Sequence, residues 1–429
     1  MKMFNRKPTH RRFNFSTPIR RKPSIDFSFG GLIFCCMSLF MLLAAVNGQV
    51  NLLFGVVGLM FGVLIVSFSI SRMVLRKVQI RRLLPEHAVV GEPVTLSYEF
   101  INEKRFWPSL SVSFAEMEGS EGFVRQPAAY MLHAAAGMTS TVPTEVIPKR
   151  RGLLVLEHYQ ISTSFPFGFI KRASIRAERD TMIIYPAIGR VDPKLLSLCR
   201  AADKTGPTMR PRRGGTDEFY GVKEYRTGEN PRWIYWRRSA RTGVLVSKEM
   251  TQVSPPRLAL LVDTFQKSQS AAANAEVEKS IAMAASLASH ALEAGLLVGL
   301  MVWNGQWTGI QPQRGKRHRR DLLAVLARLP LNLDHDAQAL LDASRDVLKS
   351  GMTAVLFTPR DMQMGLTDHE RGGMIVLSAA GEQSSRWFTF QQDIDFFHCM
   401  PLDQEPTVLR GRPAGRAKRA VPQETAATR

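Results

Sequence analysis

The sequence predicts a multidomain protein: a two-helix transmembrane hairpin, then a β-rich, sandwich-like domain, then a doubly wound α/β domain. Two uncharged apolar runs stand near the start of the 429-residue chain, short alternating segments divided by Pro and Gly follow, and strand and helix patterns then alternate. This length allows more than one domain. The expected divisions are a basic tail at 1–28, the hairpin at 29–71, a β-rich domain at 72–198, a linker at 199–215, a final folded region at 216–404 and a disordered basic tail at 405–429.

The first two elements are apolar segments of membrane-spanning length. Residues 29–46 are 18 consecutive residues without a charge, residues 52–70 are 19 more, and five residues separate them. About 20 apolar residues cross a hydrocarbon core as a helix. We therefore expect a tight transmembrane hairpin rather than two buried core helices or a cleaved signal peptide.

Charge predicts the orientation of this hairpin. Residues 1–28 contain eight Lys and Arg against one acid, residues 71–82 contain five against none, and the hairpin loop has no charge. Because basic flanks stay on the cytoplasmic side, both chain ends and the body after the hairpin are expected in the cytoplasm. The predicted location is the inner (plasma) membrane as a multi-pass protein, with its basic flanks at anionic lipid headgroups.

The distribution of charge argues against a nucleic-acid partner. The formal net charge is +20, and the segments 1–28, 71–82, 199–215 and 405–429 together account for all of it. A nucleic-acid-binding body needs a continuous basic surface, so a membrane-tethered nucleic-acid-binding protein is the weakest of three functions considered. The four cysteines have no metal-ligand or disulfide spacing.

Residues from about 75 to 190 alternate in the period of two that is typical of strands. Turn signals at close spacing favour a sandwich or small barrel. Within this stretch Gly152 is expected to form a turn between strands, and the aromatic run 165–169 is expected to pack under a Pro-Gly corner.

Residues 214–250 are the most distinctive part of the chain, because arginine, tryptophan and tyrosine cluster there between strand-like segments at 219–226 and 244–250. Asn230 is a good N-cap and Pro231 suits a first helical position. Gly243 is a typical helix stop. We predict one helix over residues 231–241.

This region resembles the signature of a bacterial family known as domain of unknown function 58. The matching residues are Glu218, Phe219, Glu224, Tyr225, Arg226, Gly228, Arg232, Ile234, Trp236, Ser239, Ala240, Arg241 and Lys248. The family usually has an acid where this chain has Tyr235. Residues 150–152 and 165–168 also resemble the family, which places them in a β-rich domain after a membrane hairpin.

From residue 257 onward strands and helices alternate, which favours a largely parallel sheet covered on both faces. The expected strands are 257–263, 296–305, 306–313, 352–359 and 374–378, and the expected helices are 275–295, 319–329 and 336–350. This order resembles a von Willebrand factor type A domain, in which the first strand ends in an Asp that belongs to a metal site.

The metal site of such domains is degenerate in this chain. The resemblance implies an Asp and two Ser at alternate positions, with further oxygens downstream around one hard cation. Here only Asp263 remains, because Phe265 and Lys267 occupy the Ser positions and Arg360 interrupts the downstream turn 358–361. We expect no metal and no cofactor, and we expect Asp263 to cap a neighbouring helix or to pair with Lys267.

Catalytic motifs are missing from the sequence, and one carboxylate pair is the basis of an alternative function. Glu218 and Glu224 would share one face of a continuous strand, so an enzyme using both carboxylates is possible in principle. A buried ion-pair network with Arg226, Arg232 and Arg241 is the explanation that we favour.

The signature has two possible roles. As an internal clasp, Trp233, Ile234 and Trp236 would dock the helix on the α/β body, whereas as an interface the arginines and aromatic residues would be exposed. We expect a mixture, with Trp236 structural and Arg232 and Arg241 in contact with a partner.

The family resemblance implies partners rather than a reaction. Similar proteins are associated with a MoxR-type AAA+ ATPase and with transglutaminase-like membrane proteins. We therefore expect a non-catalytic, membrane-anchored adaptor that faces the cytoplasm and assists the assembly or maturation of a client complex.

Overall fold

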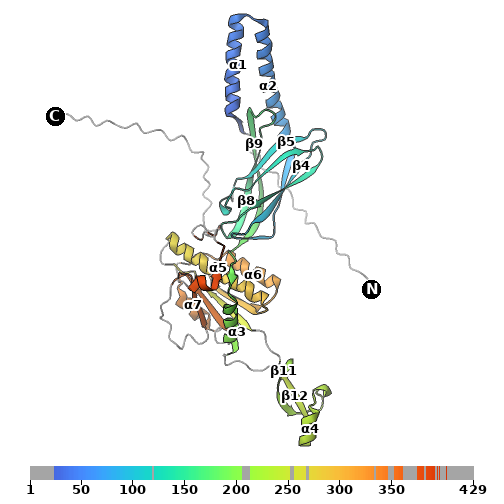
Figure 1. Ribbon diagram of the computed structural model, residues 1–429, viewed down its shortest axis with the longest axis vertical. Helices are drawn as coiled ribbons and strands as arrows, with labels where there is room; N and C mark the ends of the chain where they lie inside the picture. Colours follow the sequence, from blue (N-terminus) through green and yellow to red (C-terminus); the bar gives the residue numbers. More distant parts are fainter. Residues whose placement is uncertain are drawn as a thin grey trace, which may run out of the picture.

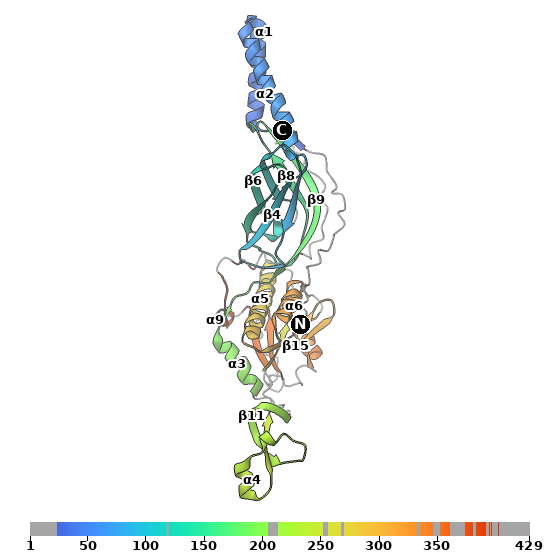
Figure 2. The ribbon, with the colours of Figure 1, turned by 90° about the vertical axis from the view of Figure 1, so that its right-hand side faces the viewer.

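The described parts of the protein are arranged along one long axis: the apolar helices, the β-rich domain, the α/β domain and the module of residues 213–251. The computed structural model describes residues 24–117, 120–204, 213–251, 256–266, 270–332, 335–345, 352–360, 374–380 and 383–391, with Ile394, Phe396 and Leu402. Both basic tails lie outside the described residues, apart from 24–28. Figure 1 and Figure 2 show two apolar helices at one end and the signature strands at the other.

The apolar helices are α1 (Phe29–Gly48) and α2 (Asn51–Leu75), which pack side by side as a hairpin. Both are long and apolar enough to cross a membrane, and only a small share of each is buried. The two predicted segments are therefore confirmed as helices, and the second extends beyond its predicted end at residue 70.

Polar donors from the following domain hold the base of α2. Lys104 Nζ donates to the carbonyl oxygens of Met73 and Val74 at 3.1 and 2.8 Å, and Arg176 Nη2 donates to that of Leu75 at 3.4 Å. The last carbonyls of a helix have no partner within the helix and carry its negative dipole end. Cations therefore suit this position, although burial lowers the pKa of Lys104 to about 8.

Two sheets follow, as the alternating pattern predicted, and their neighbouring strands are antiparallel except for β3, which runs parallel to β9. Their strand orders are β1-β9-β8-β5-β6, with β3 beside β9, and β2-β4-β7. The strands are β1 (Ser24–Phe27), β2 (Val78–Leu83), β3 (His87–Val89), β4 (Val94–Asn102), β5 (Ser109–Glu116), β6 (Ala128–Ala134), β7 (Thr139–Val146), β8 (Gly152–Thr163) and β9 (Ile170–Tyr185), with a short helix η1 (Ser120–Gly122). Side chains from both sheets, including Phe100, Phe114 and Leu156, fill one core between them.

The aromatic run 165–169 only partly fulfils its predicted packing role. Phe165 packs against the core of the β-rich domain. Phe167 is 53% exposed, and Phe169 instead stacks on Phe34 of α1 with ring centroids 4.5 Å apart. The run lies against the base of the helical hairpin, because the chain turns there from β8 into β9.

The last large domain is an α/β unit built on a five-stranded sheet of order β15-β14-β13-β16-β17. Its strands are β13 (Arg257–Val262), β14 (Leu297–Trp303), β15 (Trp307–Gln313), β16 (Thr353–Thr358) and β17 (Met374–Ser378), and its main helices are α5 (Ala271–Glu293), α6 (Lys316–Ala327) and α7 (Ala337–Ala343). The β15 edge strand is antiparallel and the other neighbouring pairs are parallel.

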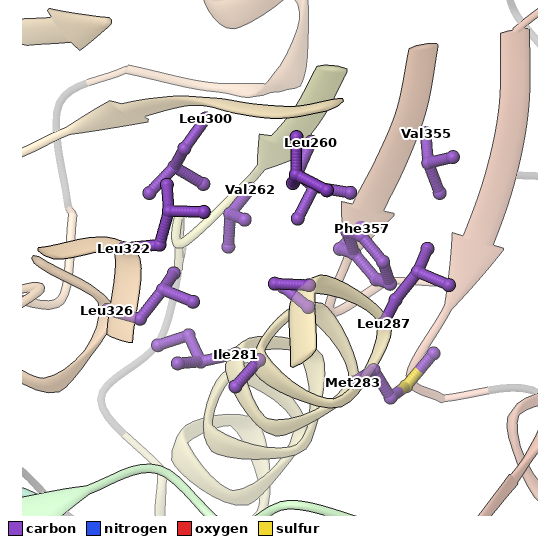
Figure 3. Packing of buried hydrophobic residues seen from close by; sticks show 14 of the residues in the cluster. Leu260, Val262, Ile281, Met283, Leu287, Leu300, Leu322, Leu326, Val355 and Phe357 are labelled. Carbon is purple, nitrogen blue, oxygen red and sulfur yellow. The ribbon is translucent and has the colours of Figure 1, made fainter. Parts of the chain in front are cut away.

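Alternate residues of these strands supply two separate apolar layers. Figure 3 shows Leu260, Val262 and Phe357 facing Ile281 of α5 and Leu326 of α6. On the opposite face the apolar residues of the strands meet α7, through Leu261, Leu340, Leu341, Ala354 and Leu356. Helices therefore cover both faces, as the run of buried strand residues predicted.

The predicted linker 199–215 is only partly a linker. Residues 199–204 complete α3 (Pro193–Lys204), residues 205–212 lie outside the described part, and residues 213–215 begin the next strand. Cys199 and Leu195 of α3 are buried in the α/β core, which explains why this polar-looking stretch continues a helix. Near the end of the described chain, α9 (Gln383–Trp387) leads into β18 (Phe388–Thr389), which pairs with β10 (Arg190–Val191).

Candidate functional site

The signature residues form a small module of their own, residues 213–251, called the signature module below. It consists of β11 (Arg213–Glu224), the 3₁₀ helix η2 (Pro231–Trp233), α4 (Trp236–Thr242) and β12 (Val246–Thr251). The two strands pair with each other in a two-stranded sheet of their own. In Figure 1 and Figure 2 the module extends beyond the α/β domain, at the end of the molecule far from α1 and α2.

The predicted single helix over 231–241 is wrong, because its middle pairs with a strand. Ile234 forms a bridge with Ser247, and the Tyr235 amide donates to the carbonyl of Val246 at 2.7 Å. These contacts hold Ile234 extended and divide the segment into η2 and α4. The predicted ends are confirmed: Asn230 Oδ1 accepts from the Arg232 amide at 3.1 Å, and Gly243 ends α4 with a φ of 72°.

A few polar contacts hold the signature module together. Ser239 Oγ accepts from the Val246 amide at 2.8 Å, which ties α4 to β12. Lys223 Nζ donates to Glu229 Oε1 at 2.6 Å, and this bond lowers the pKa of Glu229. Tyr225 donates its hydroxyl to the Glu229 carbonyl at 2.9 Å, which fixes the turn before η2.

Trp236 and the basic side chains of the segment 226–248 are exposed, whereas Ile234 is buried and Tyr225, Trp233 and Tyr235 are half-buried. Trp236 is 65% exposed, so the expectation that it is structural is wrong. The segment 226–248 carries six basic residues and one acid, and that acid is Glu229, which Lys223 binds. Its exposed basic residues are Arg226, Arg232, Arg237, Arg238, Arg241 and Lys248, and its large exposed apolar residues also include Val244 and Leu245.

The expected buried ion-pair network is also wrong. Arg226, Arg232 and Arg241 are exposed, and within the described residues none of them has an acidic partner within ion-pair distance. Lys248 lies over the ring of Tyr235 at 5.1 Å, so the residue that replaces the family's usual acid binds a cation with its aromatic face. Gly228 has a φ of 105°, which glycine adopts readily.

The carboxylate pair needs a continuous strand, and β11 is not continuous. Glu218 is paired with Thr251 and Glu224 with Val246, with a register shift between Phe219 and Gly221. Six steps along β11 therefore match five along β12. Because side chains alternate across a strand, this bulge removes the regular period that would place the two carboxylates on one face.

Asp263 stands at the end of β13, where the sequence predicted a degenerate metal position. Its Oδ1 accepts from the Phe265 amide at 2.9 Å, and its Oδ2 accepts from Thr358 Oγ1 at 3.2 Å. Arg360 Nη2 lies 3.7 Å from Oδ2, and its guanidinium covers the Phe265 ring at 4.9 Å. Burial raises the pKa of Asp263. The carboxylate closes a turn rather than capping a helix, and the proposed pairing with Lys267 lies outside the described residues.

The chemistry of this edge is therefore that of a structural contact. A guanidinium lies where a cation would meet Asp263, and the neighbouring Phe265 contributes an aromatic face instead of an oxygen. Among the described residues there is no group of three or more His, Cys, Asp or Glu that could hold a metal ion.

Sequence reasoning missed a buried arginine whose guanidinium nitrogens are all hydrogen-bonded, Arg151. Its Nε and Nη2 donate to the two carboxylate oxygens of Glu278 on α5 at 2.7 and 2.8 Å. Its Nη1 donates to the carbonyls of Leu326, Ala327 and Leu329 at the end of α6, at 2.9 to 3.0 Å. Arg151 thus joins the β-rich domain to the α/β domain.

Arg151 and Glu278 are both almost wholly buried. Burial raises the pKa of the Glu278 carboxyl, and the guanidinium opposes this rise. The sequence signal was the pair 150–151 before Gly152, which we interpreted as a turn. Within the β-rich domain another buried arginine, Arg82, donates hydrogen bonds from Nε and Nη2 to the two carboxylate oxygens of Glu116.

Comparison with protein families gives one match. Residues 221–362 match the family described as "Protein of unknown function DUF58". This region carries the DUF58 pattern. The match confirms the resemblance that the signature residues predicted, and it spans most of the signature module together with the α/β domain as far as residue 362.

The other comparisons add no functional information. No curated protein matches this chain. Among solved structures, the chain is similar to the crystal structure of β-glucosidase from Listeria innocua, at 11% identity and a TM-score of 0.16. That match covers 25% of this chain and 16% of the enzyme, and so low a score carries no argument about fold or function.

Proposed function

We propose that this DUF58 protein is a membrane-anchored, cytoplasm-facing adaptor without chemistry of its own, and that the signature module is its docking element. The observation that carries the proposal is the exposure of the basic signature residues and of Trp236 at the far end of the molecule from the apolar helices. Tryptophan, tyrosine and arginine are the residues that most often anchor protein interfaces. A surface that serves only folding would bury them.

The α/β domain supports this reading through its topology. Its central strand β13 lies between two parallel neighbours, β14 and β16, and ends at Asp263 beside the β14–β15 hairpin. We assign it as a von Willebrand factor A-like domain whose metal position is degenerate. Ligands of such open sheets meet the carboxyl ends of the strands, and here Arg360 takes the place next to Asp263.

For the partner, we propose the class that the family resemblance implies, a MoxR-type AAA+ ATPase, with a transglutaminase-like membrane protein as a further candidate. The excess of basic residues in 226–248 suits an acidic surface on that partner. We do not extend the proposal to catalysis by Glu218 and Glu224, because the strand bulge disrupts their alignment.

A pull-down of the full-length chain from solubilised membranes, with and without ATP, tests the docking role. The double variant Arg232→Ala/Arg241→Ala and the single variant Trp236→Ala should each lose most of the recovered ATPase. Arg345→Ala is a matched control, because this arginine is also exposed but lies next to α7 in the α/β domain. Equal recovery by all the variants would overturn the proposal.

The membrane topology is tested separately. Reporters fused at residue 429 and before residue 1 should both be active only in the cytoplasm, because the bases flank the hairpin and its loop is uncharged. Activity of either reporter outside the cytoplasm would show that the hairpin is not inserted as proposed.

A further inference from the structure

Arg172 of β9 is a buried cation without an acidic partner among the described residues. The residue is only 8% exposed, yet its Nε and Nη1 have no hydrogen-bond partner. Its guanidinium lies over the ring of Phe68 on α2, at 5.1 Å from the ring centroid. An unpaired buried charge is costly, so a position that retains one is suited to receive an anion.

A second arginine, Arg72, lies about one helical turn after Phe68 on the same face of α2. Arg72 lies exposed in the last turn of α2. Burial lowers the pKa of Arg172, and the nearby positive charge of Arg72 lowers it further. Among the described residues neither guanidinium has an acid within ion-pair distance. Asp26 of β1 is opposite Lys171 in the strand register, one position from Arg172, which places it on the other face of the sheet.

Along the axis of α2, Arg72 and the ring of Phe68 that Arg172 covers lie close to the end of the apolar run, where the hydrocarbon core would meet the lipid headgroups. The apolar run of α2 ends at residue 70. At a rise of about 1.5 Å per residue, Phe68 lies about 3 Å inside that end and Arg72 about 3 Å beyond it. Headgroup layers extend roughly 5–7 Å beyond the hydrocarbon core, so the two guanidinium groups stand where lipid phosphates lie.

Contacts on the other helix lie near the same end of the hairpin. The Phe169 ring stacks on Phe34 of α1 and on the exposed ring of Phe167. At Gly31 of α1 an added Cβ would collide with the Phe169 carbonyl oxygen, so the sandwich backbone touches the helix directly. The β-rich domain therefore reaches the bilayer surface around both helices.

We propose that Arg172 and Arg72 bind the phosphate of an anionic phospholipid headgroup at the base of the hairpin. The inference rests on the membrane-spanning hairpin of the proposed function. The planar fork of an arginine fits a phosphate with two parallel hydrogen bonds. Two positive charges without an acidic neighbour favour a lipid with a net negative charge over a zwitterionic lipid.

The test uses the full-length protein, purified in mild detergent and depleted of lipid. Its melting temperature is followed while phosphatidylglycerol, phosphatidylcholine or inorganic phosphate is added. Phosphatidylglycerol should raise the melting temperature at the lowest concentration, phosphatidylcholine only at a higher one, and inorganic phosphate should have no effect. An equal response to phosphatidylcholine, or an equal response to inorganic phosphate, would overturn the proposal.

Variants locate the effect. Arg172→Gln and Arg72→Gln should weaken the phosphatidylglycerol midpoint by roughly 10-fold or more, since a hydrogen bond to a charged group contributes that much. Arg172→Gln should also leave the lipid-free melting temperature unchanged or higher, because it removes an unpaired buried charge. Lys171→Gln, on the neighbouring exposed position, is the matched control and should bind like the wild type.

The exposed Arg72 provides a second variant in case the buried Arg172 cannot be replaced without unfolding the protein. If Arg172→Gln fails to fold, Arg72→Gln tests the same site from an exposed position. Unchanged midpoints in both arginine variants would refute the lipid site. This failure differs from failure of the proposed function, which would appear as wild-type protein in the soluble fraction or as lost selectivity in the pull-down.

Discussion

Arg151 and the signature arginines Arg232 and Arg241 have similar neighbours in the sequence, but Arg151 is buried and the other two are exposed. Arg151 follows another arginine and precedes a glycine, and it is buried with all three of its nitrogens bound. Arg232 and Arg241 also lie among basic residues close to a glycine, and they are exposed without acidic partners in the described part of the chain. Residue type thus says little about whether an arginine holds the fold or meets a partner.

What distinguishes them is the set of elements that the tertiary fold brings close. Arg151 meets a carboxylate on α5 and three carbonyls at the end of α6. The strands of the signature module pair only with each other in the sheet topology, and Arg232 and Arg241 are exposed. We infer that Arg151 is essential to stability and the signature arginines to contact.

The largest effect is expected at the domain junction. Arg151→Ala should lower the free energy of unfolding by roughly 3–5 kcal/mol, because it leaves the Glu278 carboxylate buried without its partner. Chemical denaturation of the full-length protein in detergent measures this. The double variant Arg151→Met/Glu278→Leu should recover a large part of the loss, since it also removes the buried charge. If Arg151→Ala lowered the free energy of unfolding by less than about 1 kcal/mol, Arg151 would not differ from the exposed signature arginines in its contribution to stability.

The next effect concerns Asp263. Asp263→Ala should cost about 2 kcal/mol, because the Phe265 amide and the Thr358 hydroxyl lose their acceptor. Thermal melts with and without Mg²⁺ check this, and the cost should be the same in both. A cost that appears only with Mg²⁺ would instead show that Asp263 retains a metal.

Asp263 also predicts a pH dependence. Its pKa in the folded protein is raised above the ordinary value of 3.8. The folded state therefore binds this proton more tightly than the unfolded chain. Its contribution to stability is fully present below about pH 4 and is lost as the pH rises through the folded pKa. Asp263→Asn should remove that slope, measured as the difference between variant and wild type across pH 3 to 7.

A smaller effect is expected at the base of the hairpin. Lys104→Met should lower stability by about 1 kcal/mol, because the carbonyls of Met73 and Val74 lose a charged donor at the end of α2. The matched control is Lys171→Met, at an exposed position of β9. Equal melting temperatures for the Lys104 variant and the wild type would show that the sandwich does not depend on this contact.

The smallest effect on stability is expected in the signature module. Arg232→Ala and Arg241→Ala should each change the free energy of unfolding by less than about half a kcal/mol, as exposed substitutions do. Trp236→Ala should also be mild, since that side chain is 65% exposed. Large melting shifts for both arginine variants would mean that the motif is an internal clasp and that the comparison with Arg151 fails.

The sequence predicted the elements whose signals are local. The two apolar helices, the alternating strands of the β-rich domain and the buried strands of the α/β domain follow from runs and periods that each segment carries in itself. The ends at Asn230 and Gly243 were predictable for the same reason, because caps depend on neighbouring residues.

Long-range contacts overruled the remaining predictions. The helix at 231–241 breaks because Ile234 pairs with Ser247 of β12, and a bulge of β11 against β12 breaks the regular period that the Glu218–Glu224 pairing required. The burial of Trp236 was predicted from residue type and did not occur.

By itself, the sequence determined which segments are apolar helices, which are strands and where the charge excess lies, because those properties depend on composition and period. Only the tertiary structure decided that Arg151 joins two domains, that Arg172 stays unpaired beside α2, and that Arg232 faces solvent. The physical reason is that a side chain's charge is local, whereas its partners and its burial come from segments that the chain brings together from far apart.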